Sequence, residues 1–551
     1  MVCQLALPGP YFDEAAHCVY AIWILRGEHI AWGPPFVYFP FGIPVLGSLG
    51  YYVGPLQGYL VLLLMYLSGI STAVMRIIPI LFMTMSLPFV FFFMRNRFGN
   101  VSAYVTTLLF VFQPSLLLWS RVGLYPFSIL VFFICSSIYF LNRWLCTGNS
   151  CSLVIGFFML GLGLQTFITF AWYVLALGMT TIVMRLRTGI RMRQIPLMIG
   201  GFLGGIGPYL LPWVSGDNIR FFIRFAIVSH AGISNLLYAD NLLLRIRHLG
   251  VLIEGSGLEL YGGTHPNHLA IPIFAGSVLG TVLAVVLSRV LRRRRLTSHL
   301  FLLLMFFLML IQTPITISSL NHIHMIPLLP ISLMIVGSFL GQSWNVIESK
   351  WSSSPIIKAR ILLGSCKILL LITLSFSIVP NLVNVTQYQA DLKRTGGVGS
   401  WSNGIEDSAN YLVTANYTYV LIGDWGISYG LFVASKGKLR LGESLVEIFW
   451  LQDKSFQIAV ERYLEMGSVC FIFWRNSSTG WSKLELLQKS LANQQRSLVL
   501  DKTFHQRDGV PVIDIYRVNA ATSSVSQSQI QEIMIVDCAS DFPPRNLPIR
   551  N

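Results

Sequence analysis

Two adjacent carboxylates near the start of the chain, Asp13 and Glu14 in YFDEAAHCVY, could carry out acid–base chemistry. A carboxylate within hydrogen-bond reach of an acceptor hydroxyl can remove its proton as the oxygen attacks a substrate. A neighbouring acid could orient the acceptor or hold a divalent cation, because hard cations prefer oxygen ligands. The alternative is structural: Asp13 caps a helix that ends at about residue 25, and Glu14 lies in its first turn, where the helix dipole favours negative charge.

Positive side chains that could stabilise an anionic leaving group lie in two places. Arg121 stands in WSRVGLYP at the end of an apolar stretch, and Arg245 and Arg247 lie in the polar segment 215–268. Cationic donors beside a phosphate stabilise its charge. Two structural alternatives stay open, because Arg121 could snorkel to lipid headgroups and the cations of segment 215–268 could form a solvated face. That segment also contains Arg220, Arg224, His230 and His248.

The composition places these residues in a membrane protein. Of 551 residues, 54% are hydrophobic and 11% are charged, and the mean hydropathy is +0.64. These values are typical of a polytopic α-helical membrane protein and unlike those of soluble domains. The net charge of +15 then indicates basic cytoplasmic loops and gives no reason to expect nucleic acid as a partner. The eight cysteines form no CxxC pair, so neither a zinc site nor a disulfide framework is indicated.

Ten segments are predicted to cross the bilayer, which takes about 20 apolar residues each. They cover approximately residues 74–94, 101–119, 125–142, 151–167, 168–184, 196–214, 269–290, 299–319, 323–341 and 361–380. Every second loop between them is rich in Arg or Lys, and the positive-inside rule places those loops in the cytoplasm. Asp13, Glu14, segment 215–268 and both chain ends are therefore expected on the extracytoplasmic side.

The residues before the first span form the first of four expected regions, an extracytoplasmic loop over 1–72 with amphipathic or interfacial helices. Its apolar stretch 53–68 reaches only about 24 Å, too short for a comfortable span, and its first half is weakened by Gly54 and Pro55. We expect it to lie in or dip into the outer interface.

The other three regions follow from changes in composition. Residues 73–384 form the transmembrane domain. In residues 385–520, strand-like stretches at 418–422, 468–474 and 511–518 alternate with helix-like ones, which favours an extracytoplasmic α/β domain. Residues 521–551 are rich in Ser, Gln and Pro and are expected to be a flexible tail.

Several stretches in order resemble the membrane glycosyltransferases of the C-type fold, in particular the protein O-mannosyltransferase and aminoarabinose transferase branch. They are FDEAAHCVYAIWILRGEH, YYVGPLQGYLVLLLMYLSG, AVMRIIPILFMTMSLPFVFFFMRNRFG, SRVGLYPFSILVFF and HIHMIPLLPISLMI. Related enzymes begin with a span before the acidic loop, whereas MVCQLALPGP is too short for one, and loop 120–124 lacks the acidic residue that many members carry.

The resemblance implies sugar transfer from a polyprenyl- or dolichyl-phosphate donor to an acceptor protein, lipid or glycan outside the plasma membrane. The acidic pair then belongs to the active site, with Asp13 as the general base, and no cofactor beyond an optional divalent cation at Glu14 is expected. Donor-phosphate binding is assigned to Arg121, Arg245 and Arg247. Substrate binding is assigned to His17, Tyr52, Glu254, Glu259 and His265.

Two other functions fit parts of the sequence. A transporter or flippase of a lipid-linked or glycan substrate would suit the many spans, but transporters usually place ionisable residues at mid-membrane, and these spans carry almost none. The motif GISYG at 426–430, with His505 downstream, fits the G-x-S-x-G nucleophile elbow of hydrolases. With 46 glycines in 551 residues, a chance match to that motif is expected about 0.3 times in this chain, so the glycosyltransferase is favoured over both.

Overall fold

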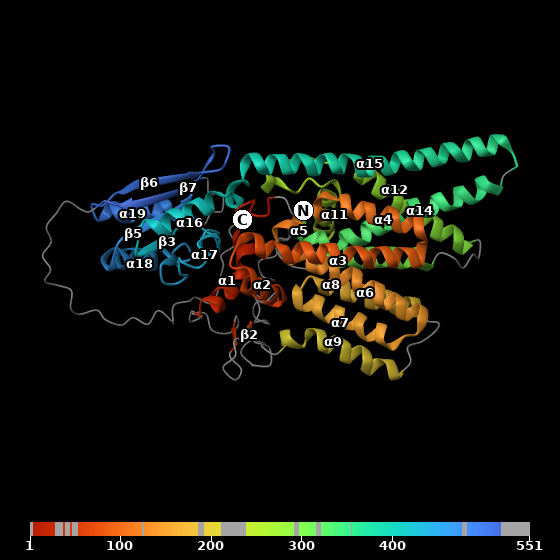
Figure 1. The fold of residues 1–551 in the computed structure, drawn as a ribbon, viewed down its shortest axis with the longest axis horizontal. Helices are drawn as coiled ribbons and strands as arrows, with labels where there is room; N and C mark the ends of the chain where they lie inside the picture. Colours follow the sequence, from red (N-terminus) through yellow and green to blue (C-terminus); the bar gives the residue numbers. More distant parts are fainter. Residues whose placement is uncertain are drawn as a thin grey trace.

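The computed structural model describes residues 4–27, 37–38, 45–46, 53–123, 126–185, 192–210, 238–290, 297–315, 321–353, 355–475 and 482–519. The molecule consists of a bundle of long helices with a small α/β domain at one end (Figure 1). We call this end of the bundle the domain end. The predicted tail 521–551 lies outside the described residues.

The bundle contains most of the apolar helices found in the described residues. They are α3 (Thr72–Phe98), α4 (Asn100–Phe112), α5 (Pro114–Val122), α6 (Phe127–Thr147), α7 (Ser150–Thr166), α8 (Phe170–Arg185), α9 (Ile195–Leu210), α12 (Ala270–Val290), α13 (Thr297–Gln312), α14 (Leu329–Ser353) and α15 (Ile357–Thr395). Three further helices are α1 (Phe12–Arg26), α2 (Leu56–Ser68) and α11 (Tyr238–Glu254). Short 3-10 turns include η4 (Glu259–Tyr261), η7 (His322–Leu328) and η8 (Gly399–Trp401). A two-stranded antiparallel ribbon joins β1 (Val37–Tyr38) and β2 (Val45–Leu46).

A helical membrane part is confirmed, since each of the ten predicted spans overlaps a described helix. Six helical stretches of the described chain are long and apolar enough to cross a bilayer: α3, α6, α12, α13, α14 with η7, and α15. Helices α7 and α8 are apolar but have only 17 and 16 residues. The total of ten spans stays a prediction. Helix α2, within the predicted interfacial stretch, has 13 residues and lies at the domain end beside α1 (Figure 1).

The predicted span 101–119 is a broken helix. Its halves α4 and α5 meet at an angle of 51° around Gln113. Pro114 offers no N–H to a helical hydrogen bond and keeps the preceding residue out of the α-helical region, so Gln113 is extended with φ −73° and ψ 114°. The Gln113 amide donates to the carbonyls of Leu252 (2.7 Å) and Ile253 (3.2 Å), so the break holds the end of α11 against the bundle.

Glycines allow α14 and α4 to pack closely. A Cβ at Gly337 of α14 would lie 2.0 Å from Thr106 Oγ1 of α4, and one at Gly341 would lie 2.5 Å from Ser102 Cα. Residues four apart share a helix face, so both contacts fall on one seam. Small residues at this spacing are typical of close helix pairs in membranes.

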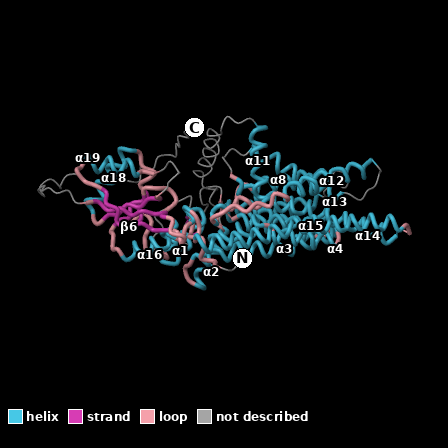
Figure 2. The backbone as a smooth tube through the Cα atoms, turned by 90° about the horizontal axis from the view of Figure 1, so that it is seen from above, coloured by secondary structure: helices cyan, strands magenta, loops and turns pink. Residues whose placement is uncertain are grey.

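The α/β domain contains one sheet in the order β4-β3-β5-β7-β6. Its strands are β3 (Tyr419–Ile422), β4 (Leu445–Glu447), β5 (Val469–Trp474), β6 (Leu498–His505) and β7 (Pro511–Val518). β3 is parallel to β4 and β5, while β7 is antiparallel to β5 and β6. Helices α16 (Gly404–Thr414) and α17 (Ser428–Ala434) pack on one face, and α18 (Asp453–Met466) and α19 (Leu484–Asn493) on the other (Figure 2). Side chains of β5 alternate between these cores, so all six are buried.

The three predicted strands are confirmed as β3, β5 and β7, whereas β4, β6 and α17 were not predicted. β4 has three residues, too few for an alternating pattern to be recognised. The predicted domain boundary at 385 falls inside α15, which runs without a break from Ile357 to Thr395. This helix therefore connects the far end of the bundle to the α/β domain (Figure 1).

A leucine at Gly341 should destabilise the protein, because its side chain would overlap the α4 backbone at Ser102. We expect Gly341→Leu to lower the free energy of unfolding by about 1–3 kcal/mol, the usual effect of overpacking. The measurement is the midpoint of thermal unfolding in detergent. Gly276→Leu on α12 is the matched control, since a Cβ there meets no atom within 4 Å; equal loss in both variants would contradict the close seam.

Candidate active site at the domain end

A buried ion pair joins α1 to the first spanning helix. Arg76, in the second turn of α3, donates from Nε and Nη2 to the two carboxylate oxygens of Glu14, both at 2.7 Å. Its remaining N–H groups donate to the carbonyls of Leu5 (2.9 Å), Pro8 (2.8 Å) and Gly9 (3.4 Å). All five guanidinium N–H groups thus have an acceptor, which compensates the large cost of burying the charge.

Glu14 is therefore a fixed counter-ion within the described structure. Its side chain is 1% exposed, and that of Arg76 is completely buried. Burial raises the pKa of the Glu14 carboxyl, and the Arg76 guanidinium acts in the opposite direction. A second acid, Glu406 of α16, accepts from Thr72 Oγ1 at 3.3 Å and lies close enough for its charge to interact with Arg76.

Asp13 precedes this pair but points along another side of α1, because neighbouring helical residues are rotated by about 100°. Its side chain is partly buried. The alternative in which Asp13 caps the helix is wrong: the N-cap is Tyr11, with extended backbone, and both acids lie in the first turn. His17, one turn further, is buried, its Nδ1 has no hydrogen-bond partner among the described residues, and burial lowers its pKa to about 4.

Arg121 also faces the N-terminal segment. Its side chain is 1% exposed and its Nη2 donates to the carbonyls of Gln4 and Leu7, the latter at 3.3 Å. Arg76 and Arg121 together bind five backbone carbonyls of the segment 4–9, those of Gln4, Leu5, Leu7, Pro8 and Gly9. Arg121 therefore lies against the segment that precedes the two acids, and its buried side chain does not snorkel to lipid headgroups.

A basic cluster forms where α11 meets η7. His248 lies close enough to Arg245, one turn earlier on α11, and to His322 of η7 for their charges to interact. All three also lie within such range of His324 of η7. His322 Nε2 is 3.0 Å from the Gly257 carbonyl. Burial lowers the pKa of Arg245, and burial followed by the neighbouring Arg245 and His322 lowers that of His248. Arg247, the other predicted phosphate ligand of α11, is exposed on its surface.

Aromatic rings lie between this basic cluster and the acidic pair. The Trp119 ring of α5 is 6.2 Å from the His322 ring and 6.3 Å from that of Trp401, measured between centroids. Trp401 in turn stacks on Tyr11 at 4.0 Å with an interplanar angle of 9°. Trp119 Nε1 and His248 Nδ1 are both buried and have no hydrogen-bond partner among the described residues. Such unsatisfied buried atoms are uncommon and point to a bound ligand or water.

The other predicted substrate residues lie around the loop after α11. His265 Nε2 is 2.7 Å from Asp391 Oδ2, and its backbone N–H donates to the Tyr388 hydroxyl at 2.9 Å, so this residue ties the loop to α15. Glu254 lies 3.4 Å from His268 Nδ1, and Glu259 is exposed within interaction range of His322. Tyr52, Arg220, Arg224 and His230 lie outside the described residues.

Neither a hydrolase triad nor a metal centre is seen in the described part of the chain. Ser428 donates its hydroxyl to Glu447 Oε1. His505 ends β6, which is separated from β3 by β5 and β7, so it lies about 14 Å to the side of the β3 end that leads to Ser428. No group of three or more His, Cys, Asp or Glu residues is arranged to hold a metal ion there.

Sequence reasoning missed Arg76, Trp119 and Trp401. A signal existed for Arg76, since an arginine near the start of an otherwise apolar span is expensive and marks a buried partner or a functional site. No local signal identifies Trp119 or Trp401, because their proximity depends on the packing of α5 against η8.

Comparisons with known proteins agree with this architecture. The family model "Dolichyl-phosphate-mannose-protein mannosyltransferase" matches residues 53–207. The crystal structure of ArnT from Cupriavidus metallidurans in the apo state has a TM-score of 0.60 at 12% identity, covering 92% of this chain and 94% of that one. The same protein bound to undecaprenyl phosphate gives 0.57 at 13% identity, with 95% of each chain covered. No curated protein sequence matches significantly.

The resemblance inferred from the sequence motifs is confirmed by the matching family model and the shared fold. Residues 53–207 match the mannosyltransferase family model, and the chain has the fold of ArnT, as the resemblance implies. The two structures of ArnT, at 12% and 13% identity, show the fold of this chain rather than its substrates.

Removing one member of the buried pair should strongly destabilise the protein. Glu14→Leu leaves the Arg76 charge buried without a counter-ion, and we expect a loss of about 3–5 kcal/mol. The double variant Glu14→Leu/Arg76→Met should be more stable than the sum of the Glu14→Leu and Arg76→Met effects implies, because no isolated charge remains. Thermal unfolding in detergent measures all three. Glu443→Gln in the exposed Arg440 pair is the control and should change little; additive single effects would contradict the coupling.

Proposed function

We propose that this protein transfers a sugar from a polyprenyl- or dolichyl-phosphate donor to an acceptor on the extracytoplasmic side of the plasma membrane. The observation that carries the proposal is a pair of buried polar atoms near His322, Trp119 Nε1 and His248 Nδ1, that have no hydrogen-bond partner among the described residues. His248 belongs to a basic cluster suited to a phosphate, and Trp119 continues through Trp401 and Tyr11 to the start of α1, where Asp13 could activate an acceptor hydroxyl. That ArnT was crystallised with undecaprenyl phosphate supports the choice of donor class.

The lipid phosphate is proposed to bind Arg245, His248 and His322. The buried guanidinium of Arg245 is partly shielded from water, so it can stabilise the negative charge that develops on the leaving phosphate. Burial lowers the pKa of His248, so at neutral pH its imidazole is a neutral hydrogen-bonding partner. Arg121 and Arg247 stay proposed contributors; the former faces residues 4–7 and the latter faces outward.

The sugar is proposed to lie along Trp119, Trp401 and Tyr11. Aromatic faces offer flat apolar surface and the indole N–H can donate to a sugar hydroxyl. These rings lead from His322 toward the start of α1. Glu254, Glu259, His265, His17 and Tyr52 remain proposed residues of the surrounding substrate site.

Asp13 is proposed to be the general base. Glu14 is bound on both oxygens by Arg76, so taking a proton there would break the ion pair that fixes α1. Asp13 would accept the acceptor's proton as its oxygen bonds to the anomeric carbon and the bond from that carbon to the phosphate oxygen breaks. The products are the glycosylated acceptor and the lipid phosphate. The acceptor could be protein, lipid or glycan, and a divalent cation is not required by this step.

Loss of the base should abolish transfer without unfolding the protein. We expect Asp13→Asn to lower kcat by at least about a hundredfold, the usual minimum contribution of general base catalysis. The assay is transfer of radiolabelled sugar from polyprenyl-phosphate donors in membranes. Glu465→Gln on the exposed face of α18 is the control. Full activity of Asp13→Asn would exclude it as the base, and no transfer by the wild type from any donor would favour a transporter.

The basic cluster gives a separate prediction for the donor. Arg245→Gln should raise KM for the lipid-phosphate donor about tenfold to a hundredfold, as expected for loss of a hydrogen bond to a charged group. Lys454→Gln is the control, because this lysine is exposed on α18 of the α/β domain and is not among the proposed donor-binding residues. Initial rates at varied donor concentration distinguish the two. An equal change in both variants would contradict a specific phosphate site at Arg245.

A further inference from the structure

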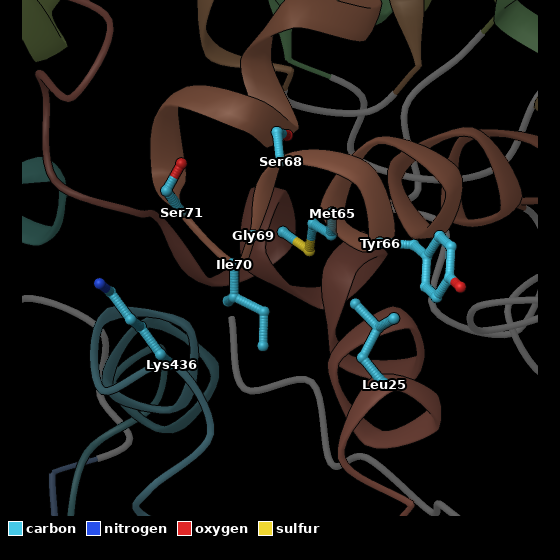
Figure 3. Close-up of a pocket in the computed structure, with 8 residues that line it drawn as sticks. All are labelled: Leu25, Met65, Tyr66, Ser68, Gly69, Ile70, Ser71 and Lys436. Carbon is cyan, nitrogen blue, oxygen red and sulfur yellow. The ribbon is translucent and has the colours of Figure 1, made fainter.

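A second site lies away from the basic cluster, at the corner between α2 and α3. An open hollow of about 620 Å³ is lined by Leu25, Met65, Tyr66, Ser68, Gly69, Ile70, Ser71 and Lys436 (Figure 3). Its volume falls within the range of about 300–1,000 Å³ that is usual for small-ligand sites. We propose that it binds the headgroup of an anionic phospholipid, independently of the glycosyl transfer proposed above.

The hollow lies at the membrane boundary. Residues Gly69 to Ser71 directly precede α3, a spanning helix of 27 residues that begins at Thr72. One turn earlier, α2 exposes large apolar side chains: Leu63 is 55% exposed, Tyr66 74% and Leu67 70%. In a bilayer this surface would contact acyl chains, and an amphipathic tyrosine suits the boundary. A phospholipid whose chains lie along α2 would place its headgroup at the corner.

One wall of the hollow is cationic. Lys436, in the turn after α17, lines the hollow and is exposed (Figure 3). Lys438, two residues later, is also exposed. None of the eight lining residues of the described structure is acidic, while Ser68 and Ser71 add hydroxyl groups. A phosphate headgroup therefore meets complementary charge and hydrogen-bonding groups, and each such lysine contributes to the attraction of anionic lipid.

The position of Lys436 is fixed by its backbone. Its N–H donates to the Val433 carbonyl at 2.9 Å, and its carbonyl accepts from the Arg26 side chain of α1. The following Gly437 lies at φ 74°, where a side chain would strain the backbone, and a Cβ there would be 2.8 Å from both Ile22 and Arg26. The turn is thus built against α1, and it presents the amine to the α2–α3 corner without reorganisation.

Retention of defined lipids by the purified full-length protein tests the proposal. The protein is exchanged into nanodiscs of equal phosphatidylglycerol and phosphatidylcholine, released into detergent, and its bound lipids are counted by native mass spectrometry. We expect phosphatidylglycerol to be retained preferentially and Lys436→Gln to weaken its retention about fivefold, the effect of one lysine at a membrane surface. Lys454→Gln on α18 is the matched control, an exposed lysine of the same domain.

Two results would overturn the proposal: equal retention of both lipids by the wild type, or unchanged phosphatidylglycerol retention in Lys436→Gln. Arg245→Gln separates this site from the donor site, because it should leave phosphatidylglycerol retention as in the wild type. If only Arg245→Gln lowers retention, the lipid belongs to the donor site and the proposal is wrong. Thermal unfolding of each variant in detergent shows that any loss of lipid does not come from loss of the fold.

Discussion

The buried ion pair between Glu14 and Arg76 is the constraint on which the arrangement of the domain end depends. A guanidinium inside the first long apolar helix is stable only if its charge and all its donors are compensated. The chain does this by folding residues 5–9 over Arg76 and by placing Glu14 against it, with five acceptors in total. Helix α1 is thereby fixed on α3. Through Trp23, whose ring is 6.0 Å from that of Phe432, the same helix packs against α17 of the α/β domain.

The pair also explains why two carboxylates stand side by side. A single acid could not both neutralise Arg76 and take part in proton transfer, because protonating it would leave the arginine buried without a counter-ion. Adjacent residues on a helix point in directions about 100° apart, so one acid can be buried while the next faces a different environment. The structure assigns the first role to Glu14 by contact. The second role falls to Asp13 as a proposal that depends on this division.

How much the sequence could predict depends on how local each feature is. The helical membrane part and the strands β3, β5 and β7 follow from apolar stretches within short windows of sequence, and these predictions are confirmed. The break at Gln113 is signalled by Pro114, but the partner that stabilises it, the carbonyl end of α11, is 139 positions away. The clustering of Arg245, His248 and His322, and the stack of Tyr11 on Trp401, likewise arise from tertiary packing. No sequence pattern within a single segment predicts these contacts.

Because the proposed site residues come from separate helices and turns, related proteins are difficult to recognise from sequence alone. The residues proposed for catalysis and binding come from α1, α5, α11, η7 and η8 rather than from a contiguous motif. Among them, His322 contacts the Gly257 carbonyl, and Trp119 and Trp401 are held by neighbouring rings. Backbone acceptors can hold a side chain whatever residues supply them, so the fold can persist while sequence diverges. That agrees with a TM-score of 0.60 at 12% identity to ArnT over nearly the full length of both chains. What must persist is a counter-ion for each buried charge, and the acidic pair at the start of α1 meets that requirement for Arg76.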